Sequence, residues 1–225
     1  MSLENSISSN LSVIRDQIED ARQNSVMSAD NVCLVAVSKT KPVEAVIGAY
    51  AVGQRVFGEN KVQEAQAKFA DLRAEKNDIE LHLIGPLQTN KVKEAIQTFD
   101  VIQTVDRPKL VKALSKEIMK QDRHPKFYIQ VNTGEEEQKA GVLPKDLSEL
   151  LDLCESEGLK VSGLMCIPPV EEEPSLHFSF LSELAKKNGL DSLSMGMSSD
   201  YELAVRFGAT HVRVGSSIFG ARDYT

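Results

Sequence analysis

The feature of this chain that most constrains its fold is a regular alternation of short apolar runs with longer segments of helical periodicity. The clearest runs, CLVAV and FYIQV, are almost continuously apolar, which is typical of strands that are covered on both faces. Strands that alternate with helices in this way form parallel sheets. We therefore predict an α/β protein with strands over residues 32–37, 55–57, 80–84, 101–103, 127–131, 161–165, 193–195 and 211–214.

Two architectures fit this alternation, a closed (β/α)8 barrel and an open, doubly wound sheet. The number and even spacing of the strands favour the barrel, as does the lack of a G-x-G-x-x-G motif after the first strand. Composition does not shift along the chain, so we predict a single domain over residues 1–225, with a TIM-type barrel over 32–222. The run PPVEEEP at 168–174 is interpreted as a solvated loop after the sixth strand.

An extra helix is expected before the barrel, within residues 1–27. Its apolar residues recur at steps of three and four and form one stripe: Leu3, Ile7, Leu11, Ile14, Ile18 and Ala21. The last strand is followed only by SSIFGARDYT, which is too short for a full outer helix. We expect the leading helix to fill that gap in the outer ring.

Proline and glycine mark several boundaries of the helices between the strands. Proline is tolerated in a first helical turn, and glycine commonly follows a last one. The chain offers both at suitable places: Pro108 and Pro144 for starts, and Gly53, Gly158, Gly189 and Gly208 for ends.

Charge and cysteine usage exclude several classes of function. A formal net charge of −7 argues against a nucleic-acid or anionic membrane surface, because phosphate backbones attract concentrated positive charge. Cys33, Cys154 and Cys166 are far apart in the sequence and lack C-x-x-C spacing, which favours reduced thiols in a reducing compartment. Residues 1–27 carry charges throughout, unlike a signal peptide, and no apolar run is long enough to span a membrane. We expect a soluble, cytoplasmic protein.

The first strand leads directly into a lysine, and the chemistry of such barrels gathers at the carboxyl ends of the strands. Lys39 follows the apolar run CLVAV, where burial of an ammonium without a partner is costly. One interpretation is that Lys39 reaches solvent at the barrel mouth and pairs with Glu59. The other is a Schiff-base lysine, since desolvation favours the neutral amine that attacks an aldehyde. Lys41, which precedes Pro42, is interpreted as a surface charge.

Polar residues also follow or lie within the next strands, each with two interpretations. Asn60 comes after the second strand, where it either faces the pocket or caps the following helix. His82 lies within the third strand, where a hydrogen-bonded interior histidine is favoured over a catalytic base. Met165 ends the sixth strand and is more typical of a core residue than of a cofactor contact.

Small residues and hydroxyls follow the seventh and eighth strands. Many barrels of this type build a phosphate site there from backbone N–H groups and helix starts. Ser198 and Ser199 offer hydroxyl groups, and Gly215 followed by Ser216 lets the backbone approach an oxyanion closely. The alternative is ordinary helix capping by Ser199 or Asp200.

Arg213 is expected to point into the barrel, since it alternates along the last strand with His211 and Gly215. An interior arginine needs an anion or another acceptor as its partner. A lysine at one strand end, a phosphate cradle and this arginine would together accommodate a phosphorylated aldehyde.

Several strings in the chain resemble those of a known family. VSKTKP, FGEN with VQEA, HLIGPLQTNK, GMSSDYELA and VRVGSSIFGAR look like the pyridoxal phosphate homeostasis protein family. That family is similar to the N-terminal barrel of bacterial alanine racemases. The match runs in order from about Val32 to Arg222, nearly the whole chain.

The resemblance implies a cofactor and a set of contacts. Pyridoxal 5′-phosphate (PLP) would be bound as a covalent aldimine on Lys39. Arg213 would face the pyridine nitrogen, and because arginine stays protonated it would disfavour protonation of the ring and weaken the ring as an electron sink. The other implied contacts are the phosphate ligands Ser198, Gly215 and Ser216, and the ring neighbours Asn60 and Met165.

The resemblance also implies a carrier rather than an enzyme. Alanine racemases use a second, C-terminal β domain that supplies a tyrosine base, and this sequence ends at Thr225. Racemisation needs an acid or base on each face of the cofactor, and His82 and Tyr224 are weak candidates for the second one. We expect a PLP-binding protein, a monomer without catalytic residues, that buffers the cofactor or delivers it to apo-forms of PLP enzymes and so maintains vitamin B6 and amino-acid homeostasis.

Two other functions remain open at this point. One is a PLP-dependent amino-acid racemase of low activity, or a lyase, in which Lys39 serves one face of the cofactor. The other is a Schiff-base aldolase that acts on a sugar phosphate, for which Glu59 is the obvious acid/base carboxylate.

Overall fold

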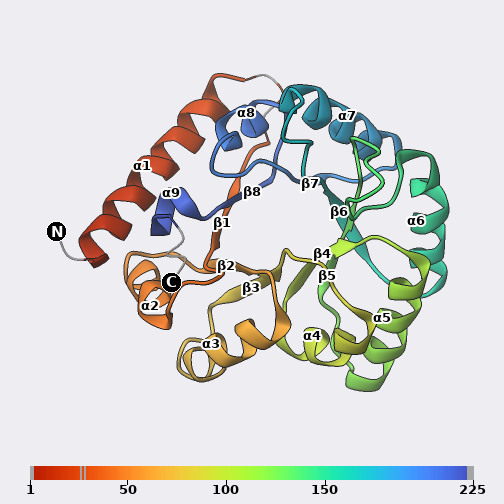
Figure 1. Cartoon of the computed structure of the whole chain (residues 1–225), viewed down its shortest axis with the longest axis horizontal. Helices are drawn as coiled ribbons and strands as arrows, with labels where there is room; N and C mark the ends of the chain where they lie inside the picture. Colours follow the sequence, from red (N-terminus) through yellow and green to blue (C-terminus); the bar gives the residue numbers. More distant parts are fainter. Residues whose placement is uncertain (1–2, 26, 28, 222–225) are drawn as a thin grey trace.

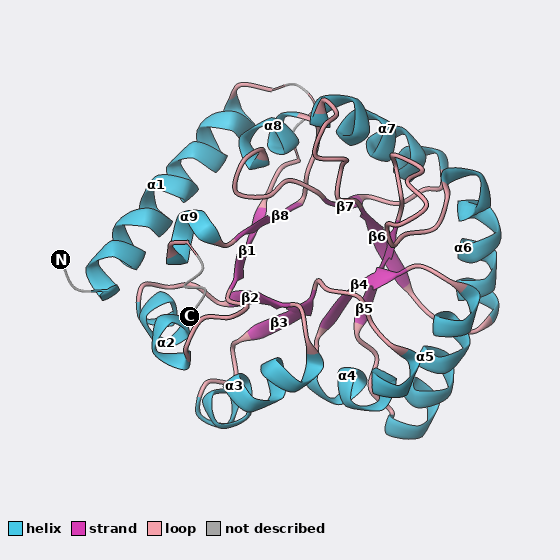
Figure 2. Ribbon diagram, viewed as in Figure 1, coloured by secondary structure: helices cyan, strands magenta, loops and turns pink. Residues whose placement is uncertain are grey.

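A computed structural model describes residues 3–25, 27 and 29–221 of the chain. In this part of the chain, parallel strands close into a barrel in sequence order, β1 to β8, with β8 pairing with β1 (Figures 1 and 2). This confirms the predicted TIM-type barrel. The strands are β1 (Cys33–Val37), β2 (Val56–Glu59), β3 (Glu80–Leu83), β4 (Val101–Val105), β5 (Lys126–Gln130), β6 (Val161–Met165), β7 (Ser192–Ser194) and β8 (His211–Val214).

Each strand coincides with a predicted one, with boundaries that differ by one or two residues or not at all. The continuous apolar runs arise because the strands are covered twice, by the outer helices and by the side chains that fill the barrel. Along β1, for example, Val35 and Ala36 point to opposite faces and both are fully buried. A barrel of parallel strands cannot leave either face in water.

An outer layer of helices surrounds the barrel (Figure 2). The helices are α1 (Leu3–Gln23), α2 (Val43–Ala51), α3 (Val62–Glu75), α4 (Val92–Thr98), α5 (Pro108–Gln121), α6 (Leu147–Ser156), α7 (Pro174–Lys187), α8 (Tyr201–Arg206) and α9 (Ser216–Phe219), with short 3-10 turns η1 (Thr89–Lys91) and η2 (Pro144–Asp146).

The predicted proline and glycine residues at the helix boundaries are confirmed. Pro108 begins α5 and Pro144 begins η2. Gly53 and Gly208 follow the ends of α2 and α8 with φ of 89° and 93°, a left-handed backbone that favours glycine. Gly158 and Gly189, which follow α6 and α7, also have positive φ, of 74° and 66°. The segment predicted as a loop after β6 is shorter by one residue, because Pro174 already forms the first turn of α7.

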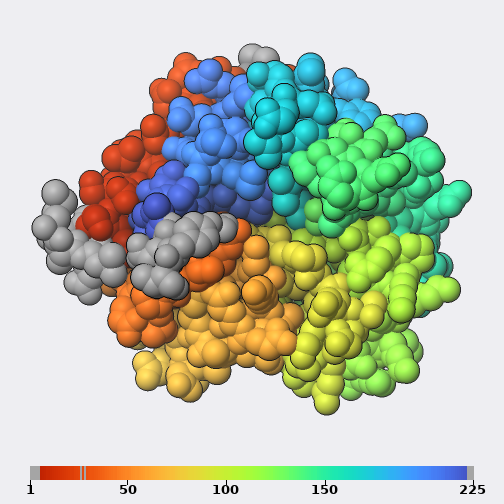
Figure 3. Space-filling view, viewed as in Figure 1, coloured from red at the N-terminus to blue at the C-terminus, as the bar shows by residue number. Residues whose placement is uncertain are grey.

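Helix α1 closes the outer ring, as expected from the shortness of α9. Its predicted stripe is buried at Ile7, Leu11, Ile14, Ile18 and Ala21, while the side chain of Leu3 lies outside the described residues. The helix packs against α2, α8 and α9, so the two ends of the described chain lie side by side, red against blue in Figure 3. No helix within the described ranges is both long and apolar enough to cross a membrane.

Candidate functional site

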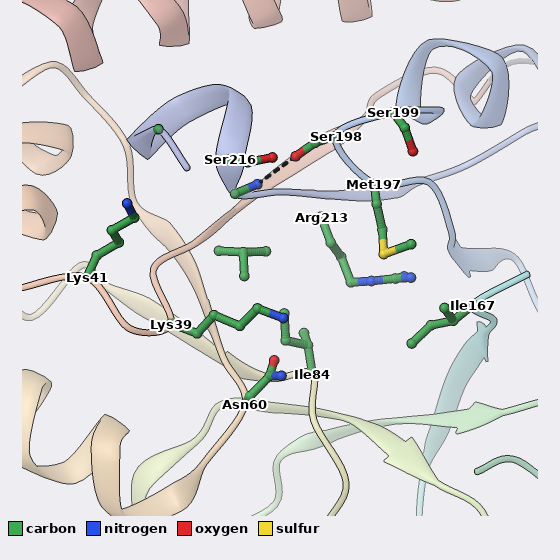
Figure 4. Close-up of a pocket in the computed structure, with 13 residues that line it drawn as sticks. Lys39, Lys41, Asn60, Ile84, Ile167, Met197, Ser198, Ser199, Arg213 and Ser216 are labelled. Atoms are coloured by element: carbon green, nitrogen blue, oxygen red, sulfur yellow. Dashed lines mark hydrogen bonds between the residues drawn. The ribbon is translucent and has the colours of Figure 1, made fainter. Parts of the chain in front are cut away.

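A cavity of about 380 Å³ opens at the carboxyl ends of the strands, a typical size for a small-molecule site (Figure 4). Its lining comes from the segments that follow β1, β2, β3, β6, β7 and β8, together with Val37 of β1 and Arg213 of β8. The lining residues are Val37, Lys39, Lys41, Asn60, Ile84, Ile167, Met197, Ser198, Ser199, Arg213, Gly215, Ser216 and Gly220. The cavity thus brings together all the predicted cofactor contacts except Met165.

Lys39 projects into this cavity from the loop between β1 and α2. Figure 4 shows its side chain extending over Asn60 and Ile84 towards the centre of the cavity. Lys41, predicted as a surface charge, also belongs to the lining and donates from Nζ to the carbonyl oxygen of Ala221 at 2.7 Å. The geometry therefore offers two ammonium groups to a ligand, with Lys39 directed into the centre and Lys41 placed at the side.

Glu59, which the sequence suggested as an ion-pair partner of Lys39, is paired with another lysine. Its Oε1 lies 2.7 Å from Lys68 Nζ of α3 and accepts a hydrogen bond from Ser38 Oγ at 2.7 Å. The carboxyl group is fully buried between β2 and α3 and does not belong to the cavity lining. Burial raises its pKa above the ordinary value, although the hydrogen bonds from Lys68 and Ser38 oppose that effect. This carboxylate is therefore engaged by Lys68 and Ser38 and does not face the cavity.

The predicted phosphate cradle lies on the opposite side of the cavity from Lys39. Ser198 and Ser216 lie together there in Figure 4, and the N–H of Gly215 donates to Ser198 Oγ at 3.2 Å. Gly215 lies close to β1, since a Cβ added to it would be 3.2 Å from Val37 Cβ. Short helix α9 begins at Ser216, so backbone N–H groups and two hydroxyls converge at this edge. Such a set of donors is suited to a phosphate group.

The alternative of helix capping by Ser199 or Asp200 does not describe this segment. Asp200 precedes α8 but makes no side-chain capping bond to it. Its Oδ1 instead accepts the backbone N–H of Met197 at 2.6 Å and stabilises the turn that presents Ser198. Ser199 lines the cavity.

Arg213 points into the barrel, as its alternation along β8 predicted, and its side chain reaches the floor of the cavity. It is only 4% exposed, and it donates from Nη1 to Ser194 Oγ at 2.7 Å and from Nη2 to the Cys166 carbonyl at 2.8 Å. In the described part of the chain no carboxylate forms an ion pair with it. Burial lowers the pKa of the guanidinium from its ordinary value. An acceptor on a ligand would therefore be a favourable partner for its remaining N–H groups.

The orientation of Arg213 is supported by a chain of hydrogen bonds across the barrel interior. Ser194 Oγ donates to Gln103 Oε1 at 2.6 Å, and Gln103 Nε2 donates to His82 Nδ1 at 2.8 Å. His82 Nε2 in turn lies 2.7 Å from Glu80 Oε1. His82 is fully buried and absent from the cavity lining. This confirms the interior, hydrogen-bonded role for His82 that its position in the strand favoured.

The two predicted ring neighbours have different positions. Asn60 lines the cavity, and α3 begins after Lys61 without a side-chain capping bond, so the structure favours the pocket over the cap. Met165 is fully buried with Val101 and Tyr128 in a small cluster and is not part of the lining. Its role next to a ring stays a prediction, while Ile167, two residues further along the alternation, does reach the cavity.

The remaining reactive side chains offer no competing site among the described residues. Cys33, Cys154 and Cys166 are free thiols, and burial raises the pKa of each to about 12. No cluster of three metal-ligating side chains occurs within residues 3–25, 27 and 29–221. Tyr224, a candidate base in the sequence, lies outside the described residues.

The barrel and its lysine-bearing mouth define the class of the protein. The family model for the alanine racemase N-terminal domain matches residues 9–223. An alanine racemase from Corynebacterium glutamicum shares this fold with a TM-score of 0.70 at 18% identity, over 97% of this chain and 61% of the racemase.

Closer relatives identify the family within that class. The chain is 41% identical to the pyridoxal phosphate homeostasis protein of Vibrio alginolyticus, over 98% of this chain and 99% of the relative. It is 38% identical to that of Escherichia coli, over 98% of this chain and 99% of the relative. The structure of PipY from Synechococcus elongatus with PLP bound superimposes with a TM-score of 0.82 at 39% identity, over 95% of this chain and all of PipY. The chain belongs to the pyridoxal phosphate homeostasis protein family.

Proposed function

We propose that this protein binds PLP through Lys39 and acts as a carrier that buffers the cofactor or delivers it to apo-forms of PLP enzymes, thereby maintaining vitamin B6 and amino-acid homeostasis. The observation that carries this proposal is the presence of Lys39, Arg213 and the cradle of Ser198, Gly215 and Ser216 on one cavity of about 380 Å³. PLP carries an aldehyde, a pyridine nitrogen and a phosphate. The cavity offers a partner for each of them.

The covalent step would be the formation of a Schiff base at Lys39 Nζ. The neutral amine attacks the aldehyde carbon, and loss of one water molecule leaves a carbon–nitrogen double bond. Asn60 and Ile84, over which the lysine extends, would hold the ring. The donors at the opposite edge would anchor the phosphate, so the ligand would be held at both ends.

Arg213 is central to the carrier interpretation. Bound PLP supplies an electron sink for amino-acid chemistry, and that sink is strongest when the pyridine nitrogen is protonated. A guanidinium has N–H donors and no acceptor. It can donate to an unprotonated pyridine nitrogen, but it cannot accept a hydrogen bond from a protonated one. Arg213 is fixed by Ser194 and by the Cys166 carbonyl, so it would keep the ring unprotonated and limit catalysis.

The composition of the cavity lining also supports a carrier over the two enzymatic alternatives. Among the described residues, the ionisable side chains of the lining are Lys39, Lys41 and Arg213. A racemase needs a second acid or base opposite Lys39, and the aldolase hypothesis depended on Glu59, which is paired with Lys68 behind the barrel wall. A weak racemase remains the second candidate, because Lys39 itself is a possible base.

Turnover and transfer assays together test the proposed function. The purified, PLP-loaded protein is expected to racemise or eliminate common amino acids no faster than Lys39→Ala does, and to activate an apo-enzyme of the PLP class on mixing. Enzyme-like turnover that is lost in Lys39→Ala would favour the racemase or lyase. Activation no better than that by an equal concentration of free PLP would restrict the role to buffering.

Two further properties belong to this proposal. We place the protein in the reducing cytoplasm, in keeping with its three free thiols. We also propose that the protein is a monomer. Light scattering after gel filtration, with and without PLP, tests the oligomeric state.

A further inference from the structure

The loop that carries Lys39 is held by charged residues of the outer helix α3. Lys68 Nζ donates to the Ser38 carbonyl at 2.7 Å, and it also lies 2.7 Å from Glu59 Oε1 and 3.1 Å from Glu64 Oε1. Ser38 Oγ binds the same Glu59 oxygen at 2.7 Å. The ammonium group of Lys68 therefore binds the backbone of the residue before Lys39 directly, and is linked to its side chain through Glu59.

The residue after Lys39 is held by the same group of charges. The backbone N–H of Thr40 donates to Glu64 Oε1 at 2.5 Å, and that oxygen is also bound by Lys68. Thr40 has φ of 61°, in the left-handed region that a β-branched residue rarely adopts. Such a conformation persists only where the surroundings impose it. Two contacts hold this peptide: the hydrogen bond to Glu64, and the turn bond from the Lys41 N–H to the Ser38 carbonyl at 3.1 Å, the same carbonyl that Lys68 binds.

The cluster of Lys68, Glu59 and Glu64 lies behind the barrel wall and is distinct from the cavity. The side chains of Lys68 and Glu59 are 7% and 0% exposed, and none of the three residues lines the cavity. Burial of the Lys68 and Glu59 charges is costly, and Glu59 Oε2 is buried without a hydrogen-bond partner, while Glu64 is 27% exposed. Simple packing of α3 against β2 would be served as well by apolar residues, so the charges point to a need for a specific backbone conformation.

We infer that Lys68 is a positioning residue for Lys39: through the Ser38 carbonyl, Glu59 and Glu64 it holds the Ser38–Thr40 backbone in the strained conformation that directs Lys39 Nζ into the cavity. This inference rests on the proposed function, because it concerns the ease with which Lys39 forms a Schiff base. It makes the outer helix α3 part of the cofactor site without any contact to the cofactor.

The first test compares the kinetics of Schiff-base formation in variants of the full chain. Lys68→Met removes the ammonium at similar side-chain length, and Lys112→Met, at an exposed position of α5, is the matched control. We expect Lys68→Met to slow the growth of PLP absorbance at least tenfold, with the control unchanged. Hydrogen exchange of the Thr40 amide in the PLP-free proteins gives a second readout, and we expect it to accelerate in Lys68→Met.

A rescue variant separates positioning from general stability. Glycine adopts positive φ readily, so Thr40→Gly added to Lys68→Met is expected to restore much of the lost rate without restoring the melting temperature. If Lys68→Met fails to fold, Glu64→Gln keeps the shape of the side chain but removes the charge that binds the Thr40 N–H. We expect Glu64→Gln to slow adduct formation and to accelerate hydrogen exchange of the Thr40 amide, each by a smaller factor than Lys68→Met does.

The possible outcomes are distinct. Wild-type rates of adduct formation and Thr40 exchange in folded Lys68→Met, or in Glu64→Gln, would overturn the positioning role while leaving the proposed function intact. Failure of the wild-type protein to form any adduct at Lys39 would overturn both. Loss of rate with rescue by Thr40→Gly would support the positioning role.

Discussion

Arg213 Nη1 donates a hydrogen bond of 2.7 Å to Ser194 Oγ deep in the barrel, so the orientation of the arginine is set by the protein before any ligand arrives. Ser194 is fully buried and itself donates to Gln103, which fixes the direction of the hydroxyl. A preorganised donor loses little freedom when it meets its acceptor. This arrangement explains how an arginine without a carboxylate partner in the described chain is accommodated at the floor of the cavity.

Replacement of that arginine tests its contact with the ring. Arg213→Gln is expected to weaken PLP binding about 10- to 100-fold, since a hydrogen bond from a charged group contributes about 1.5–3 kcal/mol. The absorbance band of the bound cofactor is expected to shift as well, because the protonation of the ring nitrogen changes. Titration of apo-protein with PLP measures both quantities. Wild-type affinity together with a wild-type spectrum would contradict the assigned contact.

The phosphate cradle predicts discrimination between PLP and pyridoxal, which lacks the phosphate. Ser198→Ala and Ser216→Ala each remove one hydroxyl from the edge of the cavity where Gly215 approaches β1. We expect each to weaken PLP binding by about 1–2 kcal/mol and to leave the weaker binding of pyridoxal unchanged. Fluorescence titrations with both ligands measure the difference. An equal loss for both ligands would place the phosphate elsewhere.

Gly85 lies so close to the backbone of Asn60 that a side chain at this position is expected to clash with it. A Cβ at Gly85 would lie 2.3 Å from the carbonyl oxygen of Asn60, an overlap that only a backbone shift can relieve. Gly85→Ala is therefore expected to destabilise the protein by about 1–3 kcal/mol and to reduce PLP affinity, because Asn60 borders the cavity. Urea denaturation and PLP titration of the same variant measure the two effects. Unaltered stability would show that this close approach is readily relaxed.

The partly buried His211 predicts a dependence of stability on pH. Burial, assisted by nearby His82, lowers its pKa from 6.5 to about 3. Because the folded chain binds this proton more weakly than the unfolded chain, the stabilisation is complete above pH 6.5 and is lost as the pH falls towards 3. Within that window the loss reaches at most about 1.4 kcal/mol per pH unit.

The variant His211→Gln isolates this contribution from that of the surrounding charges Glu80, Lys126 and Arg213. Its free energy of unfolding is expected to fall less steeply than that of the wild type between pH 6.5 and 4. Urea denaturation at a series of pH values gives both slopes. Parallel curves for the two proteins would contradict the lowered pKa.

The sequence allowed the barrel to be predicted nearly strand by strand, because a strand covered on both faces leaves a continuous apolar run. The runs that became β1 and β5 illustrate this, as does the apolar stripe of α1. The positions of Lys39, Ser198 and Gly215 followed from the rule that strand ends of a parallel barrel meet at one mouth.

Other parts of the site were not predictable from local pattern. The ion pair of Glu59 with Lys68 joins a strand end to a helix, and only the angle at which α3 packs on β2 decides that Glu59 faces outward. The resemblance implied Met165 as a ring neighbour, but Met165 is packed in the barrel interior and Ile167 lines the cavity. The depth at which side chains fill the barrel decides this, and local pattern does not reveal it. Lys41 became part of the lining because its side chain reaches Ala221, 180 residues further along the chain.

The most direct test of the central claim is to reduce the PLP-loaded protein with borohydride and to map the modified peptide by mass spectrometry. Borohydride converts a Schiff base into a stable secondary amine, so the label marks the lysine that held the cofactor. We predict one phosphopyridoxyl group per chain, on Lys39, and none at that position in Lys39→Ala. A label confined to other lysines, or no label in a protein saturated with PLP, would contradict this account.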